Sequence, residues 1–422
     1  MNHMNDYLAW RGDLGFDERP LNEADALVLS CLSYLDFTGF VPGVGEGGVS
    51  LSTACQGLLA EVGGDVSSRV RSLAPLDGEY LRQLASSRRF GDLVLHDYVD
   101  EIDERSSLQF AALCATLPDG DEFVSLRGTD STLVGWREDF MLSFTVTEAQ
   151  RRAEAYCTAV LRGLAPGRGA FLGGHSKGGN LVSFAALSCP GELRPLIREA
   201  YSFDGPGMAP EVMAQSPAEL LGRRFHHVCP AYSVIGMLLS RPGDQHAFVR
   251  SDGSGMLQHD PMTWEFLPGG LARAEGLDND ARRVDDAIAS WVAQIDLGNR
   301  EEFVGELFDA LGAGGATTFD EVLQPPSVQA VLAAAVSISD QSRELVRQLV
   351  ASTMDAYRAA AEERVAEARQ AAARQARELV RDVTERLAPS VDGREGKAEP
   401  PRGQRLLPRA GDAGPGEGRD GA

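Results

Sequence analysis

Hydrophobic residues recur along the first two thirds of the chain in helix-like and strand-like segments. Residues 22–37 place apolar side chains at helical spacing after a polar start, and residues 40–50 form a glycine-rich loop. Two short apolar runs, 107–117 and 122–127, flank the turn-forming residues 118–121, Pro-Asp-Gly-Asp. This pair of runs predicts a β-hairpin.

Helical and strand-like segments alternate more regularly after this hairpin. A helix predicted over residues 147–164 is followed by the short apolar run 170–174 and by a second helix over 180–189. Residues 198–207 and 223–231 are each typical of a strand followed by a turn. Such alternation predicts the α/β class, with a mostly parallel sheet flanked by helices on both faces.

The last third of the chain changes character, and we expect it to extend an α/β domain formed by residues 1–275. Residues 276–340 predict a helical subdomain of short helices joined by Gly- or Pro-bearing loops. Residues 341–388 predict a long C-terminal helix, which either pairs with a second copy in a homo-oligomer or packs on its own domain. Residues 389–422 are rich in Pro, Gly and charge, and predict a disordered tail.

Composition and charge limit the binding partners and the cellular compartment that we expect. The net charge of -22 disfavours nucleic acid and anionic membrane surfaces as partners. No stretch approaches the roughly 18 apolar residues of a transmembrane segment, and the first twenty residues do not resemble a secretion signal, so we expect a cytoplasmic protein. The six cysteines include no C-x-x-C pair, which favours buried free thiols over disulfides or a zinc site.

The most informative motif is G-x-S-x-G, formed by residues 174–178 as Gly-His-Ser-Lys-Gly. A nucleophilic serine in this motif lies on a strained strand-to-helix turn, where flanking side chains would clash with the strand and the helix. The run before Ser176 predicts the strand, and the run after it predicts a helix whose N-terminus stabilises negative charge. The alternative is a serine in a Gly-rich turn that only packs two elements together.

A serine hydroxyl needs an adjacent base, and histidine is the usual one. In folds with this elbow the chain order is serine, acid, histidine, so the base follows Ser176. His259 lies in a loop beyond a late strand-like run and is the first candidate, and His246 is the second. Either could instead be a surface histidine bonded to a carboxylate. His226 and His227 lie within an apparent strand, where a core or sheet-face role is expected.

The acid that orients the base must lie near the same edge of the sheet. Asp204 directly follows a predicted strand and opens a Gly-Pro-Gly turn, which makes it the first candidate. Asp244 and Asp252 are rivals, and Asp204 could instead form an Asx turn that caps this loop.

Two backbone N–H groups must bind the oxyanion that forms during acyl transfer. Lys177 directly follows the nucleophile and supplies one. Thr129 is the first candidate for the other, because it follows an early strand and the adjacent Gly128 allows close backbone approach. The alternative for this segment is an ordinary hairpin turn.

These blocks resemble the class 3 lipase branch of the α/β-hydrolase superfamily. Residues 126–130, Leu-Arg-Gly-Thr-Asp, with Trp136 and Asp139 downstream, resemble that family's Arg-Gly-Thr oxyanion segment and its following Trp and Asp. The residues around Ser176 resemble its Gly-His-Ser-x-Gly-Gly elbow, and residues 202–207 lie where the family has a Phe-Gly-x-Pro turn.

The resemblance is closer to a bacterial family of uncharacterised lipase-like hydrolases, over roughly residues 20–270. The shared blocks are Lys177 after the nucleophile, the Asp-Gly-Pro-Gly turn at 204–207, the Ser-x-x-Gly-Met-Leu-Leu block at 233–239 and the Gln-His-Asp segment at 258–260.

The chain departs from class 3 lipases at two positions. Those enzymes take their acid from an Asp-x-Val-Pro-like segment, whereas the matching residues 231–236 contain no carboxylate. Either Asp204 serves from the preceding strand, or the acid role is absent or moved. Lys177 also replaces the usual apolar residue.

Together the motifs and the resemblance imply a serine hydrolase of the lipase or esterase type. We expect His259 to take the proton of Ser176 and water to cleave the acyl-enzyme, with Asp204 as the acid of the triad. The expected substrate is an acyl ester or lipid, such as an acylglycerol, a phospholipid or a thioester, and no metal or organic cofactor is implied. The alternatives are a catalytically silent binding or scaffold protein on this fold, or a thioesterase or acyltransferase.

Overall fold

The computed structural model describes residues 1–282, apart from residues 73, 131, 210, 211, 214, 240–243 and 280, and also residues 297–318, 321, 327 and 330. The chain divides into two units, Met1–Ala360 and Ala361–Ala422, and every described residue lies in the first. The predicted long helix over 341–388 and the predicted tail over 389–422 lie outside the described residues, as does most of the predicted helical subdomain over 276–340.

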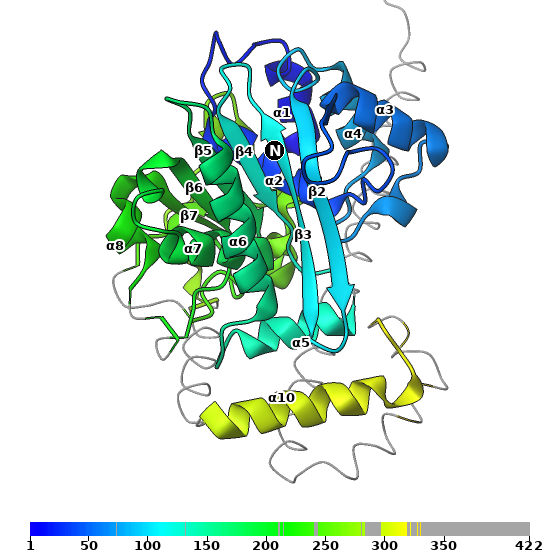
Figure 1. The fold of residues 1–422 in the computed structure, drawn as a ribbon, viewed down its shortest axis with the longest axis vertical. Helices are drawn as coiled ribbons and strands as arrows, with labels where there is room; N and C mark the ends of the chain where they lie inside the picture. Colours follow the sequence, from blue (N-terminus) through cyan, green and yellow to red (C-terminus); the bar gives the residue numbers. More distant parts are fainter. Residues whose placement is uncertain are drawn as a thin grey trace, which may run out of the picture. The chain divides into compact units, whose positions relative to one another are not determined.

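The central element is an eight-stranded sheet whose strands lie side by side in chain order. Strands β4 to β8 are parallel to one another, and β1 to β4 pair antiparallel at the other side (Figure 1). The predicted α/β fold with a mostly parallel sheet is therefore confirmed, with an antiparallel meander added to it. The strands are β1 (Gly48–Ser50), β2 (Val94–Asp103), β3 (Leu108–Thr116), β4 (Glu122–Leu126), β5 (Ala170–His175), β6 (Ile197–Phe203), β7 (Phe225–Pro230) and β8 (Ala247–Val249), and a separate pair is β9 (Phe266–Leu267) with β10 (Gly270–Leu271).

Helices cover both faces of the sheet. Helix α2 contacts β4, β5 and β6 on one face, and α6 and α7 pack on the other (Figure 1). The helices are α1 (Met4–Arg11), α2 (Glu23–Cys31), α3 (Leu51–Glu61), α4 (Gly78–Ser86), α5 (Leu133–Met141), α6 (Glu148–Gly163), α7 (Lys177–Ser188), α8 (Pro217–Leu221) and α10 (Leu297–Leu311).

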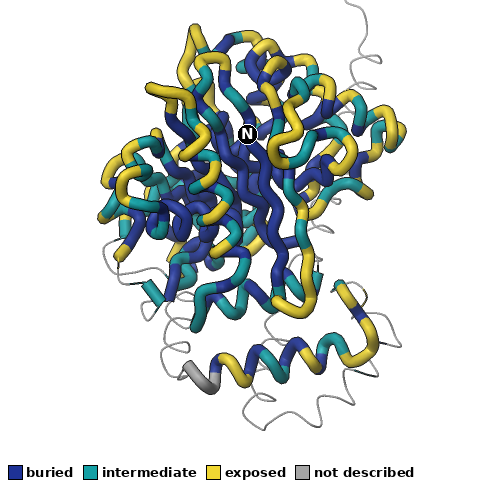
Figure 2. Tube along the Cα trace, in the orientation of Figure 1, coloured by how far each residue is buried: buried dark blue, intermediate teal, exposed yellow. Residues whose placement is uncertain are grey.

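Two hydrophobic cores lie on opposite faces of the sheet because successive strand residues point to opposite sides. On β3, Leu113 and Ala115 join the core beneath α1 to α4, whereas Ala112 and Cys114 join the core beneath α6 and α7. Figure 2 shows the strands as the most continuously buried part of the chain. A strand buried on both faces explains why 108–116 is an almost unbroken apolar run.

Most of the predicted elements form where the sequence places them. The expected hairpin is β3 and β4, paired antiparallel from Thr116 opposite Glu122. Helix α2 begins after Asn22, whose side chain accepts hydrogen bonds from two backbone N–H groups of the first turn. Helix α6 begins after Thr147, which forms a capping box with Gln150. These caps mark the helix starts that the polarity pattern predicts.

Strand β2 was not predicted from the pattern of residues 94–103. Its register shifts between His96 and Val99, so the alternation of buried and exposed positions is interrupted. Asp97 within this irregularity has a φ of 53°, and the strand carries three further carboxylates towards its end. In a bulged, acidic strand of this kind, apolar and polar residues do not alternate with a clear period of two.

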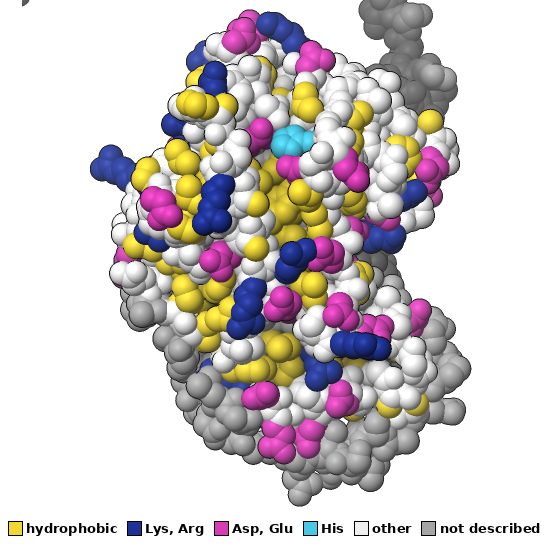
Figure 3. All heavy atoms as spheres, viewed as in Figure 1, with side chains coloured by type: hydrophobic (Ala, Val, Ile, Leu, Met, Phe, Trp, Pro, Cys, Tyr) yellow, Lys and Arg dark blue, Asp and Glu magenta, His cyan; other side chains and the backbone are white. Residues whose placement is uncertain are grey.

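The remaining features are the state of the cysteines, the length and apolarity of the helices, and the charges on the surface. All six cysteines are free and buried, which confirms the expectation of unpaired thiols. Within the described residues, no helix has the length and apolarity needed to cross a bilayer. On the face drawn in Figure 3, basic and acidic side chains are interspersed among hydrophobic ones.

Candidate active site

Ser176 lies at a sharp turn between β5 and α7. Its backbone dihedrals are φ 58° and ψ -131°, a region that non-glycine residues rarely adopt. The Ser176 N–H donates to the Phe203 carbonyl at 2.9 Å, and its own carbonyl accepts from the Gly179 N–H at 2.9 Å. The strained strand-to-helix turn predicted from the motif is thus present, and its strain is held by bonds to β6 and α7.

The motif glycines lie where three backbone segments touch. A Cβ on Gly174 would lie 2.3 Å from the Gly178 backbone. A Cβ on Gly178 would lie 2.2 Å from the Leu126 carbonyl oxygen and 3.1 Å from the Gly128 nitrogen. Because these neighbours are backbone atoms, they cannot turn aside for a side chain. The two glycines therefore bring the start of α7 directly against the residues that follow β4.

Three predicted site residues meet at the carboxyl edge of the parallel strands. The Ser176 Oγ lies 3.0 Å from Nε2 of His259, and Nδ1 of His259 lies 2.6 Å from Oδ2 of Asp204. Asp204 directly follows β6 and is fully buried. His259 is the last residue of the short helix η5 (Gly255–His259), and its side chain is 28% exposed. The arrangement links a hydroxyl, an imidazole and a carboxylate in one hydrogen-bonded relay.

The rival candidates occupy other places. Asp252 lies 2.8 Å from the His3 ring, and the His246 ring neighbours His227 with 4.6 Å between ring centroids. His226 and His227 both lie on β7, as the pattern of that run predicts. Asp244 lines a pocket beside His227.

The segment that lacks the expected carboxylate holds Asp204 instead. The hydroxyl of Ser233 donates to Oδ1 of Asp204 at 2.5 Å, and the Gly236 N–H donates to the same oxygen at 3.1 Å. Both bonds fix the orientation of this carboxylate toward His259. The contact between the 233–239 block and Asp204 could not be inferred from spacing in the sequence.

A second histidine connects the nucleophile turn to the loop that carries His259. Nε2 of His175 lies 2.8 Å from the His259 backbone carbonyl, and Nδ1 lies 2.8 Å from the hydroxyl of Tyr34. Burial, helped by the nearby His259, lowers the pKa of His175 well below its usual range. The neutral ring therefore donates through Nε2 and accepts from Tyr34. Sequence analysis identified neither role.

The Lys177 side chain is buried beneath the site. Its Nζ lies 3.0 Å from Oε2 of Glu138 and also donates to the backbone carbonyl and the side-chain oxygen of Gln109 at 2.9 and 2.5 Å. Both charged side chains of this pair are about 1% exposed or less. The charge of the lysine is therefore paired inside the protein. Lys177 is also the first residue of α7, and the first N–H groups of a helix have no partner within it.

Residues 126–128, at the end of β4 and directly after it, lie against the elbow. A Cβ on Gly128 would lie 2.3 Å from the Tyr34 hydroxyl and 2.6 Å from the His175 carbonyl oxygen, so only glycine fits there. Buried Arg127 makes two hydrogen bonds to the Asp100 carboxylate, at 2.9 and 2.8 Å. This paired geometry fixes the segment firmly between β2 and α7.

Thr129, the next residue, is anchored through its side chain. Its hydroxyl donates to Oδ2 of Asp139 on α5. Burial of Asp139 raises the pKa of its carboxyl to about 7, and neighbouring Lys177 opposes this shift. The candidate oxyanion segment is thereby tied to α5 as well as to the sheet.

Comparison with known proteins finds a similar solved structure and a matching family model. The chain is similar to the crystal structure of M37 lipase, with 16% sequence identity and a TM-score of 0.30, over 50% of this chain and 67% of that chain. Among curated proteins, none matches the chain. The Mbeg1-like family model matches residues 84–309, more than half of the 422 residues, and the chain therefore belongs to the Mbeg1-like family.

Proposed function

We propose that this protein is a serine hydrolase that cleaves a carboxylic ester through an acyl-enzyme on Ser176. The observation that supports it most is the relay from the Ser176 hydroxyl to His259 at 3.0 Å and from His259 to Asp204 at 2.6 Å. A strained serine beside an imidazole, which is itself oriented by a buried carboxylate, is the arrangement that activates a hydroxyl for acyl transfer.

In the proposed reaction, Nε2 of His259 removes the proton as Oγ of Ser176 forms a bond to the acyl carbon. Asp204 stabilises the imidazolium that results. The imidazolium then gives its proton to the departing alcohol oxygen as the ester bond breaks. A water molecule next attacks the acyl-enzyme with His259 as base, and the carboxylic acid is released as Ser176 regains its proton.

The negative charge on the former carbonyl oxygen needs donors that are already in place. The backbone N–H groups of Lys177 and Thr129 are the proposed pair. Lys177 begins α7, whose N-terminal dipole favours an anion, and Thr129 is fixed by its bond to Asp139. Contact between Gly178 and the Leu126 carbonyl holds the two segments together.

The surroundings of His259 favour an ester with an apolar acyl group. Met256 and Leu257 belong to the same short helix as His259, and they are 49% and 44% exposed. Exposed apolar side chains beside a base provide contact for a hydrocarbon chain. The Lys177 ammonium is engaged with Glu138, so it presents no cation to the substrate.

The proposal is tested by labelling the purified full-length protein with a fluorescent fluorophosphonate, followed by mass spectrometry of the labelled peptide. We expect labelling of Ser176, no labelling of Ser176→Ala, and a loss of p-nitrophenyl butyrate hydrolysis of at least about 10³-fold in that variant. Ser188→Ala, at the far end of the same helix, is the matched control and should behave like the wild type.

Failure of folded wild-type protein to react with the probe would overturn the proposal and favour the catalytically silent binding protein. Among active outcomes, a panel of acyl esters and acyl thioesters of equal chain length separates the reaction types. Preferential turnover of the thioesters would replace the esterase assignment by that of a thioesterase.

A further inference from the structure

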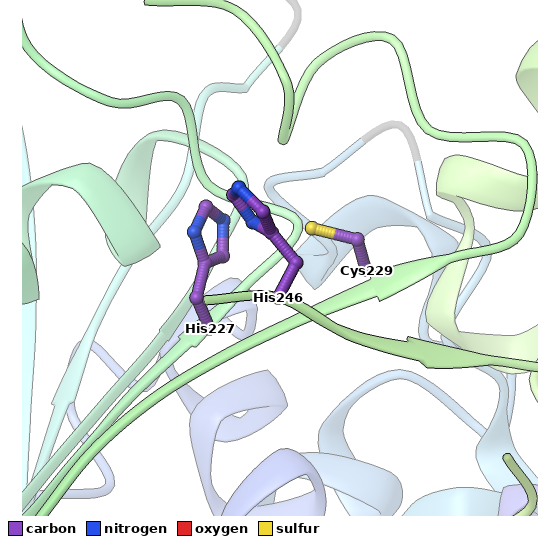
Figure 4. A group of neighbouring side chains, drawn as sticks. All are labelled: His227, Cys229 and His246. Atoms are coloured by element: carbon purple, nitrogen blue, oxygen red, sulfur yellow. The ribbon is translucent and has the colours of Figure 1, made fainter. Parts of the chain in front are cut away.

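Three side chains with metal-binding atoms gather at the junction of β7 and β8. His227 and Cys229 are two residues apart on β7 and so point to the same face of the sheet. His246 directly precedes β8, whose register pairs Ala247 with Val228. Figure 4 shows the two imidazole rings side by side, with the Cys229 sulfur directed toward the His246 ring. The ligand atoms of the three residues lie within 4.8 Å of one another.

Each of the two histidines has one ring nitrogen without a hydrogen-bond partner among the described residues. These atoms, Nε2 of His227 and Nδ1 of His246, are buried. His227 is only 9% exposed, and Cys229 is fully buried. Buried polar nitrogens are nearly always satisfied, because leaving one unpaired costs about 1–3 kcal/mol. Two such atoms beside a thiol suggest that the cluster is completed by something it binds.

We propose that His227, Cys229 and His246 form a binding site for a zinc-like divalent cation. One thiolate and two imidazoles are the ligands that Zn²⁺ prefers, and three protein ligands leave a fourth position for water. Bond lengths of about 2.1 Å to nitrogen and about 2.3 Å to sulfur require these atoms to approach one another, which side-chain rotation can supply. Sequence spacing did not reveal the site, because its ligands come from two neighbouring strands.

The charges of the cluster suit a divalent cation, because imidazole binds a metal ion in its neutral form and a cysteine binds it as the thiolate. When the cation binds, the bond from sulfur to metal forms as the Cys229 S–H bond breaks and its proton passes to solvent. One thiolate and a divalent cation then leave a net charge of about +1. Both Asp204 and Cys229 lie beside Gly236, so the Asp204 carboxylate is close enough to stabilise that charge.

A pocket borders the cluster at His227. Asp244 also lines this pocket and acts electrostatically on His246. A carboxylate at the entrance attracts a cation, and an entry path is a requirement for a metal site. His96, Asp97 and Cys114 also lie close together, but there both ring nitrogens of the histidine are engaged, Nε2 with Thr116 and Glu122 and Nδ1 with Asp97.

The test uses the full-length protein after dialysis against a chelator. Zn²⁺ affinity is measured by competition with a chromogenic chelator, and Co²⁺ is added separately as a spectroscopic probe. We expect one Zn²⁺ per chain and a near-ultraviolet charge-transfer band that reports a bond from thiolate to Co²⁺. Cys229→Ser should abolish this band, and His246→Ala should weaken Zn²⁺ binding at least about 10-fold.

Two matched controls define the site. His226→Ala removes the neighbouring histidine of β7, which is paired with Glu199, and Cys55→Ser removes another buried thiol. Both variants should bind Zn²⁺ like the wild type. Because Cys229→Ser alters a buried position, the half-buried His246→Ala variant provides an independent test. The absence of stoichiometric binding, or equal binding by the wild type and His246→Ala, would overturn the proposal.

Discussion

Buried charges near Ser176 differ in how well they are matched by partners. Lys177 is paired with Glu138, and Asp204 accepts bonds from Ser233 and Gly236. Asp139 is less well matched, because its Oδ1 is buried with no hydrogen-bond partner among the described residues. The charged form of Asp139 is therefore costly.

This imbalance gives Asp139 a pH-dependent effect on stability. Its folded pKa of about 7 is above the value of about 3.9 expected in the unfolded chain. The folded state therefore binds more protons between about pH 4 and 7, and the Asp139 contribution to stability falls as pH rises through that window. Asp139→Asn removes this contribution, so its stability relative to wild type should increase from pH 4.5 to 7.5 in urea unfolding.

Asp309→Asn, which removes a carboxylate whose side chain is 74% exposed, is the matched control for Asp139→Asn. A constant difference between Asp139→Asn and wild type across pH 4.5–7.5 would contradict the raised pKa.

The Lys177–Glu138 pair gives a second prediction at this scale. Lys177→Met leaves the Glu138 carboxylate buried without its cation, which should lower the free energy of unfolding by about 3–5 kcal/mol. The double variant Lys177→Met/Glu138→Gln removes both charges and should recover a large part of that loss. Chemical denaturation of Lys177→Met, Glu138→Gln and the double variant, together with the wild type, completes a double-mutant cycle. A double variant as unstable as Lys177→Met alone would show that packing, not charge, sets the cost.

At the scale of elements, the elbow depends on close contact between β5, α7 and the residues after β4. Gly178→Ala would place a methyl group 2.2 Å from the Leu126 carbonyl oxygen, so helix and loop must separate. We expect loss of fluorophosphonate labelling and destabilisation of about 1–3 kcal/mol from overpacking. Gly163→Ala, at the end of α6, has open space around its Cβ and should stabilise by up to about 1 kcal/mol. Labelling of Gly178→Ala at the wild-type rate would contradict this account.

The sequence predicts those parts of the fold and site that depend on local patterns. Helix α6 has a clear helical period and a capped start, strand β5 is a short apolar run, and Ser176 and His259 follow from a motif and from chain order. Tyr34 could not be identified, because its bond to His175 joins residues 141 positions apart. The hydroxyl of Ser233 is likewise brought to its acceptor only by the packing of separate strands and loops. Such contacts depend on tertiary packing and leave no periodic signal.

At the scale of the molecule, one arginine ties the N-terminal residues to the core. Arg89 is buried and bonds both carboxylate oxygens of Asp25 in α2, at 2.8 and 2.5 Å. It also donates to the backbone carbonyls of Leu14, Arg19 and Pro20. A single side chain thereby satisfies a buried carboxylate and orders the connection between α1 and α2.

Replacing this arginine should weaken the whole domain. Arg89→Met leaves Asp25 buried without its cation, and we expect thermal or urea unfolding to report a loss of about 3–5 kcal/mol. Arg88→Met alters the adjacent, exposed arginine, whose pair with Glu18 is at the surface, and it should change stability by less than about 1 kcal/mol. Equal effects of the two substitutions would refute the role assigned to Arg89.

The position of α2 has a practical consequence for fragment design. The segment matched by the family model begins at residue 84 and therefore leaves out α2. Helix α2 covers β4, β5 and β6, and Tyr34 lies three residues after its end. An expression fragment that spans residues 84–309 would expose one face of the middle strands to water. It would also lack the Tyr34 hydroxyl, which donates a hydrogen bond to His175. Cloning boundaries for this domain therefore have to start upstream of its first helices.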